Sequence, residues 1–377
     1  MSAPATSMFS PRALELARSM SLRMGKPNLE VFAERLLGLA RSNRDLVVVT
    51  SDSRGSGKLG GFAQALPKQL VEVGIAEQNL VGISAGLASC GKTVFATSPA
   101  CFLSARSLEQ IKNDVCYSDN PVKLVGISAG VSYGALGSTH HSLHDLAALR
   151  AIHNLRIVVP ADNAETRAAI ETAARMRRPF YLRFGKAPLF DLPNPAPMGD
   201  SSRHASEGDP SGRASEGDPS GHAWMADPSE TAPMGEPSGR AFEDIARARV
   251  LRDGDDAAII ATGETVIHAL LAAEKLKERS LRVRVLSVPT IKPLDHASIL
   301  AAARTTRAVV TVEEHSVHGG LGEAVAALLM QAGVSVPFRI VGFPDEYTYT
   351  GSQAELFAHY GISMEGLERA VLELVAS

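Results

Sequence analysis

The sequence predicts an α/β protein with two doubly wound domains, each built on a mostly parallel sheet. Short β-branched runs alternate with helical patterns over residues 29–190, and the same alternation returns over residues 246–377. Such alternation is typical of parallel sheets that helices cover on both faces. Residues 191–245 differ in composition and predict a linker between the two domains, while residues 1–28 form an N-terminal extension.

The first domain has clear strand and helix patterns. Apolar residues recur at helical spacing from Leu29 to Ala40, just before the apolar run 46–49, which predicts a helix and then a buried strand. Similar runs at 124–127 and 157–159 predict two further buried strands.

The linker segment is rich in Pro, Gly, Ser, Asp and Glu. It contains a tandem nonapeptide, Ala205-Ser-Glu-Gly-Asp-Pro-Ser-Gly-Arg213 followed by Ala214-Ser-Glu-Gly-Asp-Pro-Ser-Gly-His222. Because a segment of this composition buries too little apolar surface to offset its ordering entropy, we predict that it is disordered.

The second domain repeats the strand–helix pattern on a smaller scale. Strands are predicted at 257–261, 283–288 and 308–312. Helices are predicted at 264–277 and 322–331. The order predicts a second α/β domain.

Composition excludes several classes of protein. With 45% hydrophobic residues and a formal net charge of −3, the chain predicts an ordinary globular protein with no nucleic-acid or membrane partner. No apolar run approaches the roughly 20 residues of a membrane span, and no secretory signal is evident. The 3 cysteines form no Cys-x-x-Cys pair, so we expect a reducing, cytoplasmic location.

The most informative segment is Val71-Glu-Val-Gly-Ile-Ala-Glu-Gln-Asn79, where a short strand runs into a helix with Glu77 in its first turn. On its own, Glu77 could simply complement the helix dipole. Five more segments accompany it along the chain: Ser51-Asp-Ser-Arg-Gly-Ser56, Ala100-Cys-Phe-Leu-Ser-Ala-Arg-Ser-Leu-Glu-Gln110, Gly137-Ser-Thr-His-His141, Val159-Pro-Ala-Asp162 and Tyr181-Leu-Arg-Phe184. This ordered series resembles the pyrimidine-binding domain of transketolases and 1-deoxyxylulose-5-phosphate synthases.

The resemblance implies a thiamine-diphosphate site. Glu77 matches the glutamate that hydrogen-bonds N1′ of the cofactor's aminopyrimidine and favours the imino tautomer that generates the ylid. Phe102 matches the aromatic residue that stacks on this ring, although by burial tendency alone it would be a core residue. Asp52 matches a carboxylate near the thiazolium, and a turn or N-cap role is a strong alternative.

Substrate contacts are implied by three further matches. His140 matches the histidine of the family's Gly-x-Thr-His motif, which contacts the donor's oxygens, and the register favours it over His141. Arg183 matches an arginine that binds the substrate phosphate, with a surface strand arginine as the alternative. Ser56 stands where the family has a phosphate-contacting serine.

Two departures from the family pattern concern the pocket wall. Ser128 and Leu136 stand where ordinary transketolases have a histidine and an aspartate, so we expect an atypical, branched ketose phosphate as substrate. Pro99 and Ala105 replace further aromatics, which predicts a less aromatic cofactor pocket.

A third departure concerns the metal. The family binds Mg²⁺ through Gly-Asp-Gly and a downstream Asn, and no Gly-Asp-Gly occurs in this chain. The resemblance therefore implies that a partner subunit ligates Mg²⁺ and the diphosphate, in a two-plus-two heterotetramer of a split transketolase. No metal ligands are assigned to this chain, and His315 and His318 are left out of the catalytic set.

Two other functions stay open. The β subunit of a 2-oxo acid dehydrogenase decarboxylase shares this domain order and also lacks the diphosphate motif. A non-catalytic regulatory paralogue is the other alternative. The presence of Glu77, Phe102 and His140 together argues against it.

Overall fold

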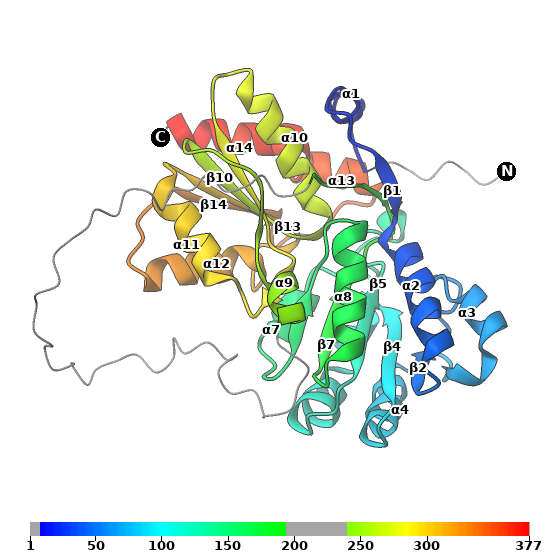
Figure 1. The fold of residues 1–377 in the computed structure, drawn as a ribbon. Coiled ribbons are helices and arrows are strands. Elements are labelled where there is room, and N and C mark those ends of the chain that lie inside the picture. Colours follow the sequence, from blue (N-terminus) through cyan, green and yellow to red (C-terminus); the bar gives the residue numbers. More distant parts are fainter. Residues whose placement is uncertain (1–7, 194–239, 377) are drawn as a thin grey trace, which may run out of the picture.

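The computed structural model describes residues 8–193 and 240–376 (Figure 1). Residues 194–239, which hold most of the predicted linker and the tandem nonapeptide, lie outside these residues. At the end of the predicted linker the chain forms helix α9 (Arg240–Ala246), so the prediction of disorder is wrong for this part of it. Within the described ranges no helix has both the length and the apolar character of a membrane span.

A seven-stranded sheet forms the centre of the first domain, with strand order β12-β6-β7-β5-β4-β2-β3. All neighbours are parallel except β12, which runs antiparallel to β6. The strands are β2 (Leu46–Thr50), β3 (Leu70–Glu72), β4 (Thr93–Pro99), β5 (Lys123–Ile127), β6 (Arg156–Val158), β7 (Phe180–Arg183) and β12 (Thr290–Lys292). The predicted strands near 46–49, 124–127 and 157–159 are thus confirmed.

Helices cover both faces of this sheet. Against one face, α2 (Asn28–Ser42) and α8 (Asn163–Arg175) bury apolar side chains such as Phe32 and Ile170. On the other face pack α4 (Glu77–Ser89) and the π-helix η2 (Ile111–Tyr117). The remaining helices are α3 (Gly60–Ala65), η1 (Pro67–Gln69), α5 (Ala100–Arg106), α6 (Leu108–Gln110), η3 (Gly134–Leu136) and α7 (Asp145–Arg150).

The second domain is a five-stranded sheet with order β14-β13-β10-β11-β9, parallel except for β9. Its strands are β9 (Arg249–Arg252), β10 (Ala257–Ala261), β11 (Val283–Ser287), β13 (Val309–Ser316) and β14 (Phe338–Phe343). Its helices are η7 (Gly263–Thr265), α10 (Val266–Lys277), α11 (His296–Thr305), α12 (Leu321–Gln331), α13 (Gln353–His359) and α14 (Met364–Ala376). The fold class predicted from the sequence is therefore confirmed.

The two domains share structure that the sequence did not predict. Strand β12 follows the second domain's β11 in the chain but joins the edge of the first domain's sheet. In the described part of the predicted extension, α1 (Pro11–Ser19) packs into the core formed with α10 and α14, and Ser10 bonds Glu365. Strand β1 (Met24–Pro27) pairs with β8 (Pro188–Phe190). Residues far apart in the chain thus hold the two domains together.

Candidate functional site

The predicted site residues follow the carboxyl ends of neighbouring strands. Asp52 comes after β2, Glu77 after β3, Phe102 after β4 and His140 after β5. The strands β3, β2, β4 and β5 are parallel neighbours, so these residues all lie at the edge of the sheet where the strands have their carboxyl ends. Ligands of open α/β sheets bind at this edge.

Glu77 is the first residue of α4 and is 4% exposed. The turn before it is fixed by Glu72, whose Oε1 accepts hydrogen bonds from the backbone N–H of Asp52 at 2.7 Å and of Gly74 at 3.0 Å. Gly74 has a φ of +73°, a conformation that glycine adopts at little cost. Glu72 therefore couples the Asp52 loop to the start of α4, a role that the sequence did not reveal.

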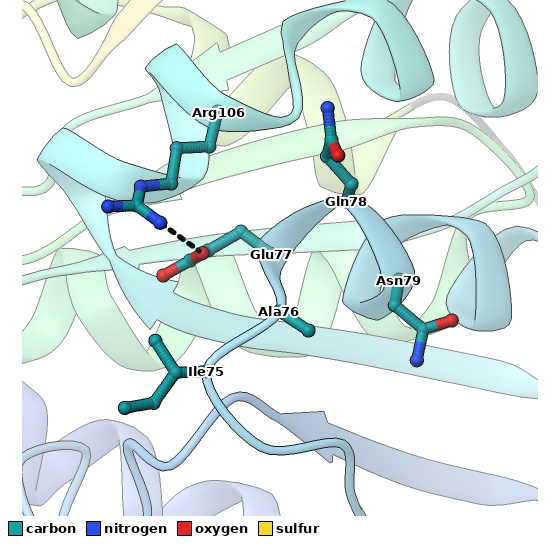
Figure 2. A pocket seen from close by; sticks show the side chains of 6 residues that line it. All are labelled: Ile75, Ala76, Glu77, Gln78, Asn79 and Arg106. Carbon is teal, nitrogen blue, oxygen red and sulfur yellow. Dashed lines mark ion pairs between the residues drawn. The ribbon is translucent and has the colours of Figure 1, made fainter.

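A hollow of about 590 Å³ opens beside Glu77 (Figure 2). It is lined by residues of the helix start and by one residue of α5: Ile75, Ala76, Glu77, Gln78, Asn79 and Arg106. A buried carboxylate at the wall of a hollow is a candidate for ligand contact.

Arg106 is a residue of this hollow that the sequence patterns did not single out. Its Nη1 lies 3.8 Å from Oε2 of Glu77, and its Cζ lies 5.4 Å from the centroid of the Phe102 ring. The signal was its spacing: Arg106 stands four residues after Phe102, so both side chains share one face of α5. Arg106 thus brings together the carboxylate and the ring that the sequence singled out.

His140 lies next to these groups. Its ring centroid is 5.4 Å from that of Phe102 and 5.6 Å from that of Tyr133, and Nδ1 is 2.9 Å from Oγ1 of Thr139. His141 is buried and its ring nitrogens contact the Gly134 carbonyl and the Thr348 hydroxyl. Of the two histidines, His140 is the one with a partly exposed ring.

Arg183 is not brought into this group. It is 6% exposed, its Nε donates to Oδ2 of Asp145 at 2.7 Å, and its Nη2 donates to the carbonyls of Ser142 and Glu314. Through the Ser142 carbonyl, this guanidinium supports the loop that carries His140. This role differs from the predicted phosphate contact. Its motif was visible in the sequence, but its partners come from distant segments.

Two of the other predicted positions lie in the loop after β2, and two lie between β5 and the end of η3. Asp52 is exposed with a φ of +50°, and Ser56 is half-buried and donates to the Ser53 carbonyl at 3.2 Å. Ser128 is fully buried, whereas Leu136 in η3 is 55% exposed. Of the two positions expected to alter specificity, Leu136 is the accessible one.

The two histidines left out of the site lie in β13 and the turn after it. His315 is fully buried, and burial lowers its pKa to about 4. His318 is exposed and its Nδ1 lies 3.3 Å from Oε1 of Glu323. Neither contacts Glu77, Phe102 or His140 through a described bond.

The residues present suit one half of thiamine diphosphate. A carboxylate at a helix start and a partly exposed Phe102 ring match a flat heterocycle that offers a ring nitrogen. In residues 8–193 and 240–376 no group of three or more His, Cys, Asp and Glu side chains could hold a metal ion.

Comparison with known proteins defines the class. Residues 27–190 match the transketolase pyrimidine binding domain, and residues 246–367 match the transketolase C-terminal domain. The chain therefore belongs to the transketolase family.

Two relatives and one solved structure align along almost the whole chain. An apulose-4-phosphate transketolase subunit of Phocaeicola vulgatus is 44% identical over 91% of this chain and 96% of that protein. The 6-deoxy-6-sulfo-D-fructose transketolase subunit SqwH of a Clostridium species is 31% identical over 92% of this chain and 93% of its own length. The structure described as a split gene transketolase, inactive beta4 tetramer, is 31% identical with a TM-score of 0.71, covering 93% of this chain and 99% of that one.

Proposed function

We propose that this chain is the pyrimidine-binding subunit of a split, thiamine-diphosphate-dependent transketolase. It transfers a two-carbon ketol unit from a ketose phosphate to an aldose phosphate such as glyceraldehyde 3-phosphate, and it acts only with a diphosphate-binding partner subunit that ligates Mg²⁺. The observation that carries this proposal is the meeting of Glu77, Phe102 and His140 at one edge of the sheet.

Each of these residues has a task that its chemistry suits. When bound, thiamine diphosphate supplies the carbon nucleophile of ketol transfer. Glu77 would hold the proton shared with N1′ of the aminopyrimidine, and Phe102 would support the face of that ring. His140 would donate a hydrogen bond to an oxygen of the substrate that gains negative charge. Asp52 would lie near the thiazolium and Ser56 near the substrate phosphate.

The partner subunit follows from what this chain contains. It has no Gly-Asp-Gly motif, and the family domains that it matches are the pyrimidine binding domain and the C-terminal domain of transketolase. Relatives of similar length are described as subunits. A two-plus-two heterotetramer would place this chain's edge of the sheet against the partner's diphosphate site.

For the donor sugar we propose apulose 4-phosphate. The 44% identical relative of Phocaeicola vulgatus is named for that substrate. The exposed Leu136 supports a donor that makes no polar contact at this position. The SqwH relative is named for a sulfonated sugar, so the assay must compare several donors.

Reconstitution tests the proposed function. The chain is co-expressed with a diphosphate-binding subunit encoded in the same genome, and ketol transfer to glyceraldehyde 3-phosphate is followed with apulose 4-phosphate and other ketose phosphates. We expect transfer by the complex and none by either subunit alone. Turnover by this chain alone, or full activity of a Glu77→Ala complex, would refute the proposal. Acyl transfer to a lipoyl domain would instead identify the oxo acid dehydrogenase alternative.

A further inference from the structure

The turn between β14 and α13 of the second domain lies against the Gly-x-Thr-His segment of the first domain. In this turn, Oγ1 of Thr348 is 2.8 Å from Oγ of Ser138 and 3.2 Å from Nδ1 of His141. Ser138 stands two residues before His140, and His141 follows it directly. One hydroxyl group of the second domain thus contacts residues on both sides of His140.

The two loops approach each other closely where the first loop has glycine. A Cβ atom at Gly134 would lie 2.7 Å from the carbonyl oxygen of Gly351, and one at Gly137 would lie 3.3 Å from Oγ1 of Thr350. Both glycines of the first loop also have a positive φ, of +44° and +76°, which glycine adopts at little cost. The contact between the domains therefore depends on the shape of both backbones as well as on Thr348.

The tautomer of His141 gives these hydrogen bonds a direction. Its Nε2 lies 3.0 Å from the Gly134 carbonyl oxygen, which can only accept, so Nε2 carries the proton. Burial lowers the pKa of His141 and outweighs the Gly134 carbonyl, which raises it, and the charge of His140 lowers it further. The ring is therefore neutral and Nδ1 is an acceptor. Thr348 donates to Nδ1, and its oxygen then accepts from the Ser138 hydroxyl.

This chain of hydrogen bonds fixes the turn that carries His140. Within the turn, the backbone N–H groups of His140 and His141 donate to the Gly137 carbonyl at 2.9 Å and 3.2 Å. These bonds shape the turn but do not fix its place above the sheet. Thr348 supplies that restraint, since it contacts the turn through Ser138 and through His141.

We propose that Thr348 is a positioning residue for His140, which it holds at the site through Ser138 and His141. Its effect on catalysis rests on the proposed function, whereas the restraint on the loop does not require it. The two groups that we propose for the cofactor follow β3 and β4 and have no described bond to this turn. Thr348 would therefore affect the step in which His140 takes part and leave cofactor binding unchanged.

Hydrogen exchange of the isolated chain, followed by mass spectrometry, tests the restraint. Exchange over residues 128–142 is compared between the unaltered chain and the Thr348→Val, Thr348→Ser and Thr350→Val chains. Valine keeps the shape of threonine without the hydroxyl, whereas serine keeps the hydroxyl. Thr350 is an exposed threonine of the same turn for which no side-chain hydrogen bond is described within residues 8–193 and 240–376. We expect about fivefold faster exchange in Thr348→Val and rates close to the unaltered chain in the other two.

Kinetics of the reconstituted complex extend the test to His140. Thr348→Val should lower kcat about fivefold with an unchanged Kd for thiamine diphosphate, and Thr348→Ser should restore kcat. Equal exchange in the Thr348→Val and Thr350→Val chains would overturn the restraint. Faster exchange in Thr348→Val with unchanged kcat would overturn the positioning role. Absence of ketol transfer by the unaltered complex, with exchange still dependent on Thr348, would refute the proposed function and leave the restraint standing.

Discussion

The Arg106 guanidinium lies 3.8 Å from the Glu77 carboxylate and covers the ring of Phe102 at 5.4 Å. The Arg106 side chain is 60% exposed, whereas that of Glu77 is almost fully buried. The exposed Arg106 side chain thus contacts both groups that we propose to bind the aminopyrimidine, the Glu77 carboxylate and the Phe102 ring. Cofactor binding would require this side chain to turn away.

Replacement of Arg106 tests this competition. An Arg106→Met chain, reconstituted with the partner, should bind thiamine diphosphate a few-fold more tightly, because an exposed cation–π contact of about 0.5–1 kcal/mol no longer has to be broken. Fluorescence titration of the complex with the cofactor measures the change, with the exposed Lys112→Met as control. Weaker binding would show instead that Arg106 contacts the cofactor.

Glu77 should matter for catalysis far more than for folding. Glu77→Gln keeps the shape of the side chain but removes the carboxylate, so we expect ketol transfer by the complex to fall about 10²- to 10⁴-fold. The midpoint of thermal unfolding should stay close to that of the unaltered chain. Glu109→Gln, an exposed glutamate of α6, is the matched control and should leave both quantities unchanged. A large loss of stability in Glu77→Gln would indicate a structural glutamate.

The buried Arg183–Asp145 pair should contribute strongly to stability. Asp145 accepts hydrogen bonds from Nε of Arg183 at 2.7 Å and from the Tyr181 hydroxyl at 2.6 Å. Removing one partner leaves a buried charge, so Arg183→Met should lower the free energy of unfolding by about 3–5 kcal/mol. The exposed pair of Arg339 and Glu373 provides the control, since Glu373→Gln should cost less than about 1 kcal/mol.

The same pair predicts an acid dependence. Burial alone would raise the pKa of Asp145, but the charges of Arg183 and His315 hold it below its usual range. A carboxyl whose pKa is lowered by folding adds stability above its unfolded pKa of about 3.9 and loses it as the pH falls through the folded value. Urea unfolding at pH 7 and below pH 4 should therefore show a smaller difference between the unaltered and Arg183→Met chains in acid.

A second buried pair predicts the opposite trend. Glu314 accepts a hydrogen bond from the Val131 backbone N–H, and this bond joins the two domains. Within the second domain, Gln353 donates to both Glu314 and Glu264. Burial and the neighbouring charge of Glu264 raise the pKa of Glu314 to about 8, and burial raises that of Glu264 to about 7. A raised carboxyl pKa stabilises the protonated fold, so this stability is complete below the unfolded pKa and is lost as the pH rises toward 8.

Glu314→Gln should remove much of that loss. We expect the free energy of unfolding of the unaltered chain to fall by about 1 kcal/mol or more between pH 5 and pH 8, and that of Glu314→Gln to fall less. Urea unfolding at both pH values measures this, with Glu373→Gln expected to follow the unaltered chain. Parallel slopes for all three chains would contradict the assignment.

Local patterns in the sequence were enough to predict several of the buried strands and helices. The strand at 257–261 coincides with β10, and the helix that begins at Glu77 is α4. Such patterns depend on residues within one or two turns, where periodicity and propensity act directly. The accessible His140, in place of His141, was also favoured by the sequence register.

The partners of the charged side chains were decided only by the tertiary structure. Asp145 forms an ion pair with Arg183, and Arg106 forms one with Glu77. The Lys186 ammonium lies over the Tyr133 ring. In each case the two residues come from different segments of the chain. By itself the sequence determined the two α/β domains, because short-range spacing encodes them, and its resemblance to a family pointed to Glu77, Phe102 and His140. Which cations stay open for a ligand depends on how distant loops meet at the sheet edge, and only the folded chain brings those loops together.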